Sequence, residues 1–175
     1  ITSPEKFERQ HPDIQAQIEK YSTVDKYGNY SMTWDLTKYL NHCCQCNSMS
    51  TGYGFEIALR DIQAGEEITT EYGVYNVQHE MELICPKPGC RGKLCPGDFD
   101  QYYKEWDERL KPVIRQIFEV EQPLLNLVKE KTILKVKEFL ADEKKYVSVY
   151  ALKYHGFPAA ISTSNGVADA ALQRG

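Results

Sequence analysis

The sequence lacks the marks of a membrane or secreted protein. No apolar run in its 175 residues approaches the roughly 20 that a helix needs to cross a bilayer, and no signal peptide is visible. Basic residues also do not outnumber acidic ones: the sequence has 21 Lys and Arg, 25 Asp and Glu, and a net charge of −4. This balance argues against direct nucleic-acid binding through bulk positive charge and suits a cationic partner. We therefore expect an intracellular protein, cytoplasmic or nuclear, that does not bind membranes.

Cysteine is absent from the last 80 residues. All six cysteines lie in two groups: Cys43, Cys44 and Cys46, and Cys85, Cys90 and Cys95. Such clusters are more typical of a metal site in a reducing compartment than of a disulfide framework. Two alternatives stay open: buried free thiols, for which Cys43 and Cys46 are the better candidates, and a disulfide pair in a secreted protein.

Helix and strand signals both occur in the first 75 residues. Ser3, followed by Pro4 and an acidic residue, predicts a helix start, and Pro12 begins a second helical run that ends near Tyr21. Short strands are predicted within residues 21–34, on both sides of a Gly-Asn turn, and over residues 55–59 and 67–72. This part is therefore predicted to be mostly β.

The chain becomes helical from Phe99. Apolar residues recur at helical spacing over residues 99–118, where Pro112 is expected to bend or restart the helix, and again over residues 124–140. A shorter apolar segment follows at residues 147–154. Residues 161–175 are mainly small and polar, and we expect a flexible tail there.

Three motifs follow one another in the middle of the chain. Residues 41–47 are NHCCQCN, residues 64–73 are AGEEITTEYG, and Cys85 and Cys90 precede an Arg-Gly pair. The first two resemble the signatures NHSCxPN and GEELxxDYG of the SET-domain protein lysine methyltransferases. The third resembles the end of the zinc-binding post-SET pattern CxCx4CRG. Because all three occur in the family's order, chance similarity is a poor explanation.

The resemblance implies a fold as well. It implies an α+β protein, mainly β, in which small sheets surround a pseudoknot and a helical extension follows. The divisions would be a SET domain over residues 1–80, a post-SET-like segment over 81–98, a helical extension over 99–160 and the tail over 161–175. The family's domains begin with a Gly-x-Gly turn beside the cofactor, and no such turn precedes Asn41. We therefore expect the N-terminal part of the domain to lie outside this sequence.

The resemblance also implies an enzyme that transfers a methyl group from S-adenosylmethionine to a lysine of a protein or peptide, a histone being one candidate. Asn41, His42 and Tyr72 would bind the cofactor, and Tyr72 would be the catalytic residue. The attacking amine must be neutral, which costs roughly 4 to 5 kcal/mol at pH 7 for a lysine of ordinary pKa. An apolar channel beside the sulfonium lowers that cost, because desolvation and like charge both disfavour the ammonium. Tyr72 would then orient the amine.

Other tyrosines are candidates for the walls of this channel, namely Tyr30, Tyr39 and Tyr75, although each also fits an ordinary place in the core or on the surface. Thr70 stands where the family often has an aromatic residue. It would widen the channel and alter the number of methyl groups added.

Zinc is implied by the post-SET resemblance, through Cys44, Cys85 and Cys90. Leu83 occupies the position of the pattern's first cysteine, so these thiolates make only three of the four ligands of a tetrahedral site. Cys95 is the first candidate for the fourth ligand and His79 is the alternative.

Two alternative functions stay open. The first is a non-catalytic, SET-like zinc-binding module that binds protein partners, which the missing Gly-x-Gly turn favours. The second is an unrelated zinc-binding regulatory protein, in which Tyr72 would lie far from Asn41. The C-terminal helices would cover the adenosine pocket, form a substrate or dimer surface, or simply cover a sheet edge.

Overall fold

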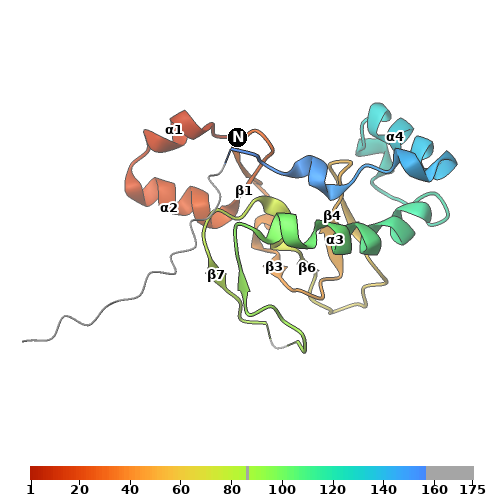
Figure 1. Cartoon of the computed structure of the whole chain (residues 1–175), viewed down its shortest axis with the longest axis horizontal. Coiled ribbons are helices and arrows are strands. Elements are labelled where there is room, and N and C mark those ends of the chain that lie inside the picture. The colour runs from red at the N-terminus through yellow and green to blue at the C-terminus, as the bar shows by residue number, and fades with distance from the viewer. Residues whose placement is uncertain (86, 157–175) are drawn as a thin grey trace, which may run out of the picture.

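The computed structural model describes residues 1–85 and 87–156, and the expected tail over 161–175 lies outside them. Two short helices begin the chain, α1 (Pro4–Glu8) and α2 (Pro12–Tyr21). The Oγ of Ser3 accepts a hydrogen bond from the backbone N–H of Lys6 at 3.4 Å, and proline occupies the first turn of both helices. Both predicted helix starts are confirmed. In Figure 1 these helices lie at one end of the molecule's long axis.

The strands are short. Eight strands of two or three residues form four two-stranded sheets in the described part of the chain. The antiparallel pairs are β1 (Ser22–Val24) with β2 (Tyr30–Met32), β4 (Ser48–Ser50) with β5 (Glu56–Ala58), and β7 (Met81–Glu82) with β8 (Lys93–Leu94). The remaining pair, β3 (Asn41–His42) with β6 (Thr69–Thr70), is parallel. The predicted hairpin after Tyr21 is confirmed, with Gly28 at a φ of 82° in its turn.

The parallel pair brings the two SET-like motifs side by side. Asn41 is opposite Thr69, and His42 is opposite Thr70. Asn47, which is 2% exposed, fixes this crossing through its amide. Its Nδ2 donates to the carbonyl of Glu67 and its Oδ1 accepts from the N–H of Thr69, both at 2.9 Å. A residue at the end of the first motif thereby aligns the second.

Helices dominate the later part of the chain. The longest element, α3 (Asp98–Arg115), crosses the middle of the molecule in Figure 1, and α4 (Glu130–Ala141) lies at the end opposite α1. Short 3-10 helices occupy Leu125–Leu127, Glu143–Lys145 and Val149–Leu152. Helix α3 continues through Pro112 without restarting, so the expected restart is wrong. No described helix is long and apolar enough to span a membrane.

The predicted helix over residues 124–140 begins later than expected. Residues 124–128 form a 3-10 turn that ends at Val128 in extended conformation, and α4 starts at Glu130. Leu124 and Leu127 are 69% and 75% exposed. Because isolated helical turns are unstable in water without a packed apolar face, these residues gain nothing from continuing the helix.

One hydrophobic core joins the N-terminal region to the C-terminal helices. It includes Met49 and Val74 from the first part of the chain and Trp106, Leu110 and Val136 from α3 and α4. All five side chains are at most 2% exposed. Close approach also requires glycine: a Cβ on Gly73 would lie 2.7 Å from the ring of Trp106, and one on Gly52 would lie 2.2 Å from the carbonyl of Ser148. The helical extension is therefore part of the same folded unit.

Candidate functional site

Tyr72 lies directly beside His42. It follows β6 and opens the 3-10 helix Tyr72–Tyr75, which the carboxylate of Glu71 caps by accepting from the N–H of Gly73 at 2.8 Å. The N–H of Tyr72 donates to Nδ1 of His42 at 3.2 Å, and the two ring centroids are 5.5 Å apart. The phenol of Tyr72 donates to the carbonyl of Leu40. The structure thus brings together two of the three predicted cofactor residues.

Asn41, the third of these residues, is exposed and lies at the start of β3. Its Nδ2 donates to the carboxylate of Glu67 at 2.7 Å, across the two motifs. Strand β3 has a partner on one side only, because its sheet has two strands. Within the described residues, the other edge of β3 therefore has no strand partner.

His42 is held neutral. Burial, followed by the nearby Arg91 guanidinium, lowers its pKa to about 4. Since Nδ1 accepts from the N–H of Tyr72, the ring proton belongs on Nε2, which lies 3.3 Å from the Sγ of Cys44. The imidazole therefore connects the Tyr72 backbone to the first cysteine group as an uncharged hydrogen-bonding group.

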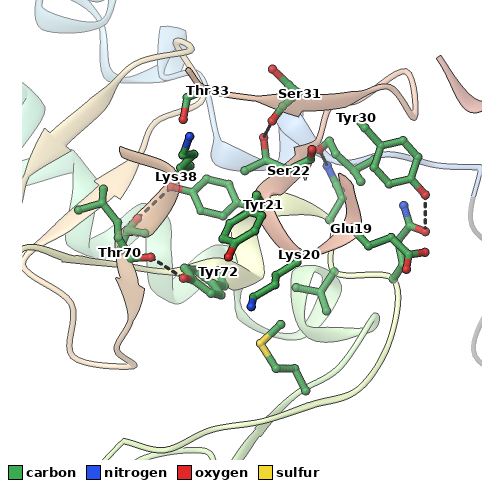
Figure 2. A pocket seen from close by; sticks show the side chains of 18 of the residues that line it. Glu19, Lys20, Tyr21, Ser22, Tyr30, Ser31, Thr33, Lys38, Thr70 and Tyr72 are labelled. Atoms are coloured by element: carbon green, nitrogen blue, oxygen red, sulfur yellow. Dashed lines mark hydrogen bonds between the residues drawn. The ribbon is translucent and has the colours of Figure 1, made fainter. Parts of the chain in front are cut away.

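A cavity of about 640 Å³ opens in front of Tyr72. Tyr21, Tyr30 and Tyr75 also line it, and Figure 2 shows Tyr21 near Thr70 and Tyr72 while Tyr30 lies farther along the wall. Two of the three predicted channel tyrosines, Tyr30 and Tyr75, thus reach the cavity. The third, Tyr39, is 57% exposed, does not line the cavity and packs edge-on against Tyr21 at 5.8 Å.

A carboxylate that the sequence analysis missed lies in the same cavity. Glu56, on β5, lines it together with Thr70 and Tyr75. Its two oxygens accept hydrogen bonds from four hydroxyl groups: Ser48 at 2.8 Å, Ser50 at 2.8 Å, Thr70 at 2.6 Å and Tyr75 at 3.1 Å. Burial, followed by the charge of Glu56, raises the pKa of Tyr75, so that this phenol stays protonated. The only signal in the sequence was the serine at every second position of β4, opposite β5.

The cysteines fall into a close group and two separate residues. The Sγ atoms of Cys43 and Cys85 are 3.8 Å apart, and those of Cys44 and Cys90 are 3.9 Å apart. Three of the four predicted ligands, Cys44, Cys85 and Cys90, therefore lie in one region, with Cys43 beside them. As they stand, no three His, Cys, Asp or Glu side chains of residues 1–85 and 87–156 form a metal-binding group.

The fourth predicted ligand lies elsewhere. The thiol of Cys95 contacts the carboxylate of Glu80 at 3.7 Å. The alternative ligand, His79, has a side chain that is 78% exposed and lies 4.0 Å from Glu19. The remaining thiol, Cys46, is buried and receives a hydrogen bond from Arg109 at 3.4 Å. Both candidates for a buried thiol, Cys43 and Cys46, are thus buried.

Comparison with known proteins agrees with the motifs and the geometry. Residues 1–73 match the SET domain. The resemblance inferred from the sequence is confirmed for this SET region, which ends one residue after Tyr72 and holds both β3 and β6. The match also covers the part of the chain that precedes Asn41.

Three curated proteins share similarity with the chain. A variant-silencing SET domain-containing protein of Plasmodium falciparum is 34% identical over 73 residues, which are 38% of this chain and 3% of that protein. Histone-lysine N-methyltransferases described as H3 lysine-4 specific, from Candida albicans and Debaryomyces hansenii, are 32% and 33% identical over 69 residues. Those residues are 34% of this chain and 7% and 6% of the two proteins. The chain thus spans less than a tenth of each relative, and no solved structure matches it significantly.

Proposed function

We propose that the chain carries the acceptor site of an S-adenosylmethionine-dependent protein lysine N-methyltransferase. The observation that carries the proposal is the position of Tyr72, which contacts His42 on one side and lines the 640 Å³ cavity on the other. A methyltransferase of this family needs one tyrosine between the cofactor strand and the lysine channel. The match of residues 1–73 to the SET domain supports the same assignment.

Asn41, His42 and Tyr72 would hold the cofactor, which supplies an electrophilic methyl group on a sulfonium. The free edge of β3 and the exposed amide of Asn41 fit the polar amino-acid end of such a ligand. The neutral imidazole of His42 adds no positive charge to a site that must accept a sulfonium. The chain's own part in the reaction is to desolvate the lysine amine and hold it in line with the methyl group.

The acceptor would be a lysine of a protein or peptide. An aromatic-lined cavity with a carboxylate in its wall suits a long aliphatic side chain that ends in an amine. Two of the relatives are described as specific for lysine 4 of histone H3, which makes a basic histone tail the first substrate to test. On the same ground we propose that the protein acts in the nucleus.

Zinc is the second group that the proposal includes. Cys44, Cys85 and Cys90 would hold it, since two of their sulfurs already receive backbone hydrogen bonds. The N–H of Arg91 points at the Sγ of Cys44, and that of Gly92 at the Sγ of Cys90, both at 3.4 Å. Such donors stabilise thiolates, which are the form that binds zinc. The metal would supply no chemistry to the transfer and would fix the segment after Tyr72.

A labelling assay tests the enzymatic proposal. The full-length protein is incubated with radiolabelled S-adenosylmethionine and a panel of lysine peptides that includes the N-terminal tail of histone H3. We expect labelling of at least one peptide, with a loss of about 100-fold or more in Tyr72→Phe, because the phenol positions the reacting amine. Equal labelling by the two proteins would contradict the role of Tyr72.

The competing proposal is a SET-like module that binds protein partners without catalysis. Calorimetric titration with S-adenosylmethionine separates the two, because the binding module predicts no saturable heat while the enzyme predicts a single binding site.

A further inference from the structure

We propose that Cys43 is the fourth zinc ligand, so that Cys43, Cys44, Cys85 and Cys90 make a complete four-thiolate site. The inference rests on the zinc part of the proposed function and does not require methyl transfer. The first post-SET cysteine is replaced by Leu83, whereas the serine of the NHSC signature is replaced by Cys43. The chain therefore lacks one thiol of the post-SET pattern and has an additional one next to Cys44.

The sulfur separations carry this assignment. Zinc binds four thiolates in a tetrahedron with Zn–S distances of about 2.3 Å, which places neighbouring sulfurs about 3.8 Å apart. The pairs Cys43–Cys85 and Cys44–Cys90 are separated by 3.8 and 3.9 Å. The thiol of Cys85 also contacts that of Cys90, which links the two pairs. Zinc binding would require side-chain rotations that turn all four sulfurs toward one centre, since as they stand no three of them form a metal-binding group within residues 1–85 and 87–156.

Backbone donors surround these four sulfurs. Besides the N–H groups of Arg91 and Gly92, the backbone of Lys87 and of Cys44 donates to the sulfur of Cys85. The backbone of Gln45 donates to the sulfur of Cys43. Hydrogen bonds of this kind compensate the negative charge that four thiolates bring to one ion. Cys43 therefore has a backbone donor as the other three cysteines do, but it is buried in the core while they are partly exposed, and this burial raises the pKa of its thiol.

Cys95, the ligand expected from the sequence, fits less well. Its sulfur lies beside the carboxylate of Glu80, a negative group that opposes a thiolate. Cys46 has a separate role, since its sulfur and carbonyl both accept from Arg109 on α3. Neither thiol is placed to close the tetrahedron as Cys43 is.

A site closed by Cys43 would act on the strand that holds the cofactor. Cys43 directly follows β3, and its N–H donates to the carbonyl of Thr70 on β6 at 3.1 Å. The metal would thus anchor the end of the parallel crossing to the segment around Cys85 and Cys90. Zinc binding would then restrain the ends of β3 and β6, and with them the positions of Asn41, His42 and Tyr72.

Cobalt spectroscopy on matched variants tests the inference. The purified full-length protein is stripped of metal under reducing conditions and titrated with Co²⁺ and then Zn²⁺, beside Cys43→Ser, Cys95→Ser and Cys44→Ser. We expect the sulfur-to-cobalt charge-transfer absorption to fall by about a quarter in Cys43→Ser and to stay unchanged in Cys95→Ser. Zinc affinity should fall at least tenfold in Cys43→Ser and in Cys44→Ser.

X-ray absorption spectroscopy counts the sulfur, nitrogen and oxygen atoms bound to zinc, and this measurement does not depend on Cys43→Ser being folded. The zinc-loaded wild-type protein and Cys95→Ser should both show four sulfur neighbours and no nitrogen or oxygen neighbour. Three sulfurs in Cys95→Ser would overturn the inference in favour of Cys95. Failure of the wild type to bind zinc, or mass spectrometry showing only disulfides Cys43–Cys85 and Cys44–Cys90, would overturn the zinc site itself. The labelling assay, run on the same samples, reports separately on methyl transfer.

Discussion

The carboxylate of Glu71 and the guanidinium of Arg91 form a buried ion pair, with Oε1 and Nη2 2.6 Å apart. Glu71 precedes Tyr72, and Arg91 follows Cys90, so the pair joins the acceptor site to the cysteine segment. Arg91 also lies 3.4 Å from Asp98 at the start of α3 and covers the ring of Tyr102 at 4.6 Å. Burial raises the pKa of Glu71, and the charge of Arg91 opposes that rise. Glu71 therefore depends on Arg91 to remain charged inside the protein.

Removal of one partner should destabilise the fold strongly. We expect Glu71→Ala to lower the free energy of unfolding by about 3 kcal/mol or more, because it leaves the Arg91 charge buried without its main partner. Urea denaturation followed by circular dichroism measures the change. Glu67→Ala, a substitution on the other side of the parallel crossing, is the control and should cost under about 1 kcal/mol. Equal losses in both variants would contradict the importance of the buried pair.

The C-terminal helices should be required for the stability of the SET region. Trp106 is 2% exposed, and its ring leaves room only for glycine at position 73. We expect Trp106→Ala to lower the free energy of unfolding by about 3 to 5 kcal/mol, as for other buried aromatic residues. Leu127→Ala removes a side chain that is 75% exposed and should change stability by less than about 0.5 kcal/mol. A small effect of Trp106→Ala would show that α3 packs only loosely on the SET region.

Local signals in the sequence were sufficient for the first helices, whose starts at Pro4 and Pro12 follow from capping residues that act within one turn. The meeting of the two motifs was implied by the resemblance to the SET signatures and not by local signals. Tertiary packing decided the rest. Residues 124–128 have a helical apolar pattern, but Leu124 and Leu127 are largely exposed, and the segment does not join α4.

In the candidate site, too, some residues could be predicted from sequence motifs and others only from the folded structure. Tyr72 and His42 are recognised by motif, and the structure places them in contact. Glu56 and Cys43 could not be assigned in this way, because their neighbours come from other elements. Four hydroxyl groups from three segments converge on Glu56, and Cys85 reaches Cys43 from 42 residues away. Only the folded chain shows that these groups are together.

Low pH should remove the contribution that Glu66, in the loop before β6, makes to the stability of the fold. The hydrogen bond from Arg60, together with those from the N–H of Gln63 and from Asn47, lowers the pKa of Glu66 to about 2. A carboxyl whose folded pKa lies below its unfolded value stabilises the fold above the unfolded pKa of about 4.3 and loses that effect as the pH falls toward 2. We therefore expect Glu66→Gln to be less stable than the wild type at pH 7 and equally stable near pH 2.

Urea midpoints measured from pH 7 to pH 2 test this expectation. The difference between the wild type and Glu66→Gln should close between about pH 4.3 and 2, since that is the window set by the two pKa values. Glu82→Gln, a substitution at an exposed residue of β7, is the control and should give no such convergence. A difference that stays constant over the whole range would mean that Glu66 does not titrate as its contacts indicate.

Glu56 should influence how the acceptor lysine binds more than how fast it reacts. Its carboxylate lines the cavity, and a cationic side chain entering that cavity would gain from the negative charge. Glu56→Gln keeps the shape and removes the charge. We expect it to raise KM for a lysine peptide about 3- to 10-fold, on the order of 1 kcal/mol, and to leave kcat within about 2-fold. Steady-state kinetics with the best peptide of the labelling panel measures both values.

Glu19→Gln provides the matched control, because Glu19 lines the same cavity from α2 but lies on the side of Tyr30, away from Tyr72, in Figure 2. It should leave KM nearly unchanged. A fall in kcat with unchanged KM in Glu56→Gln would instead mean that the carboxylate acts through Tyr75, by holding the cavity wall in place. The carboxylate would then be a positioning group and would not attract the substrate's charge.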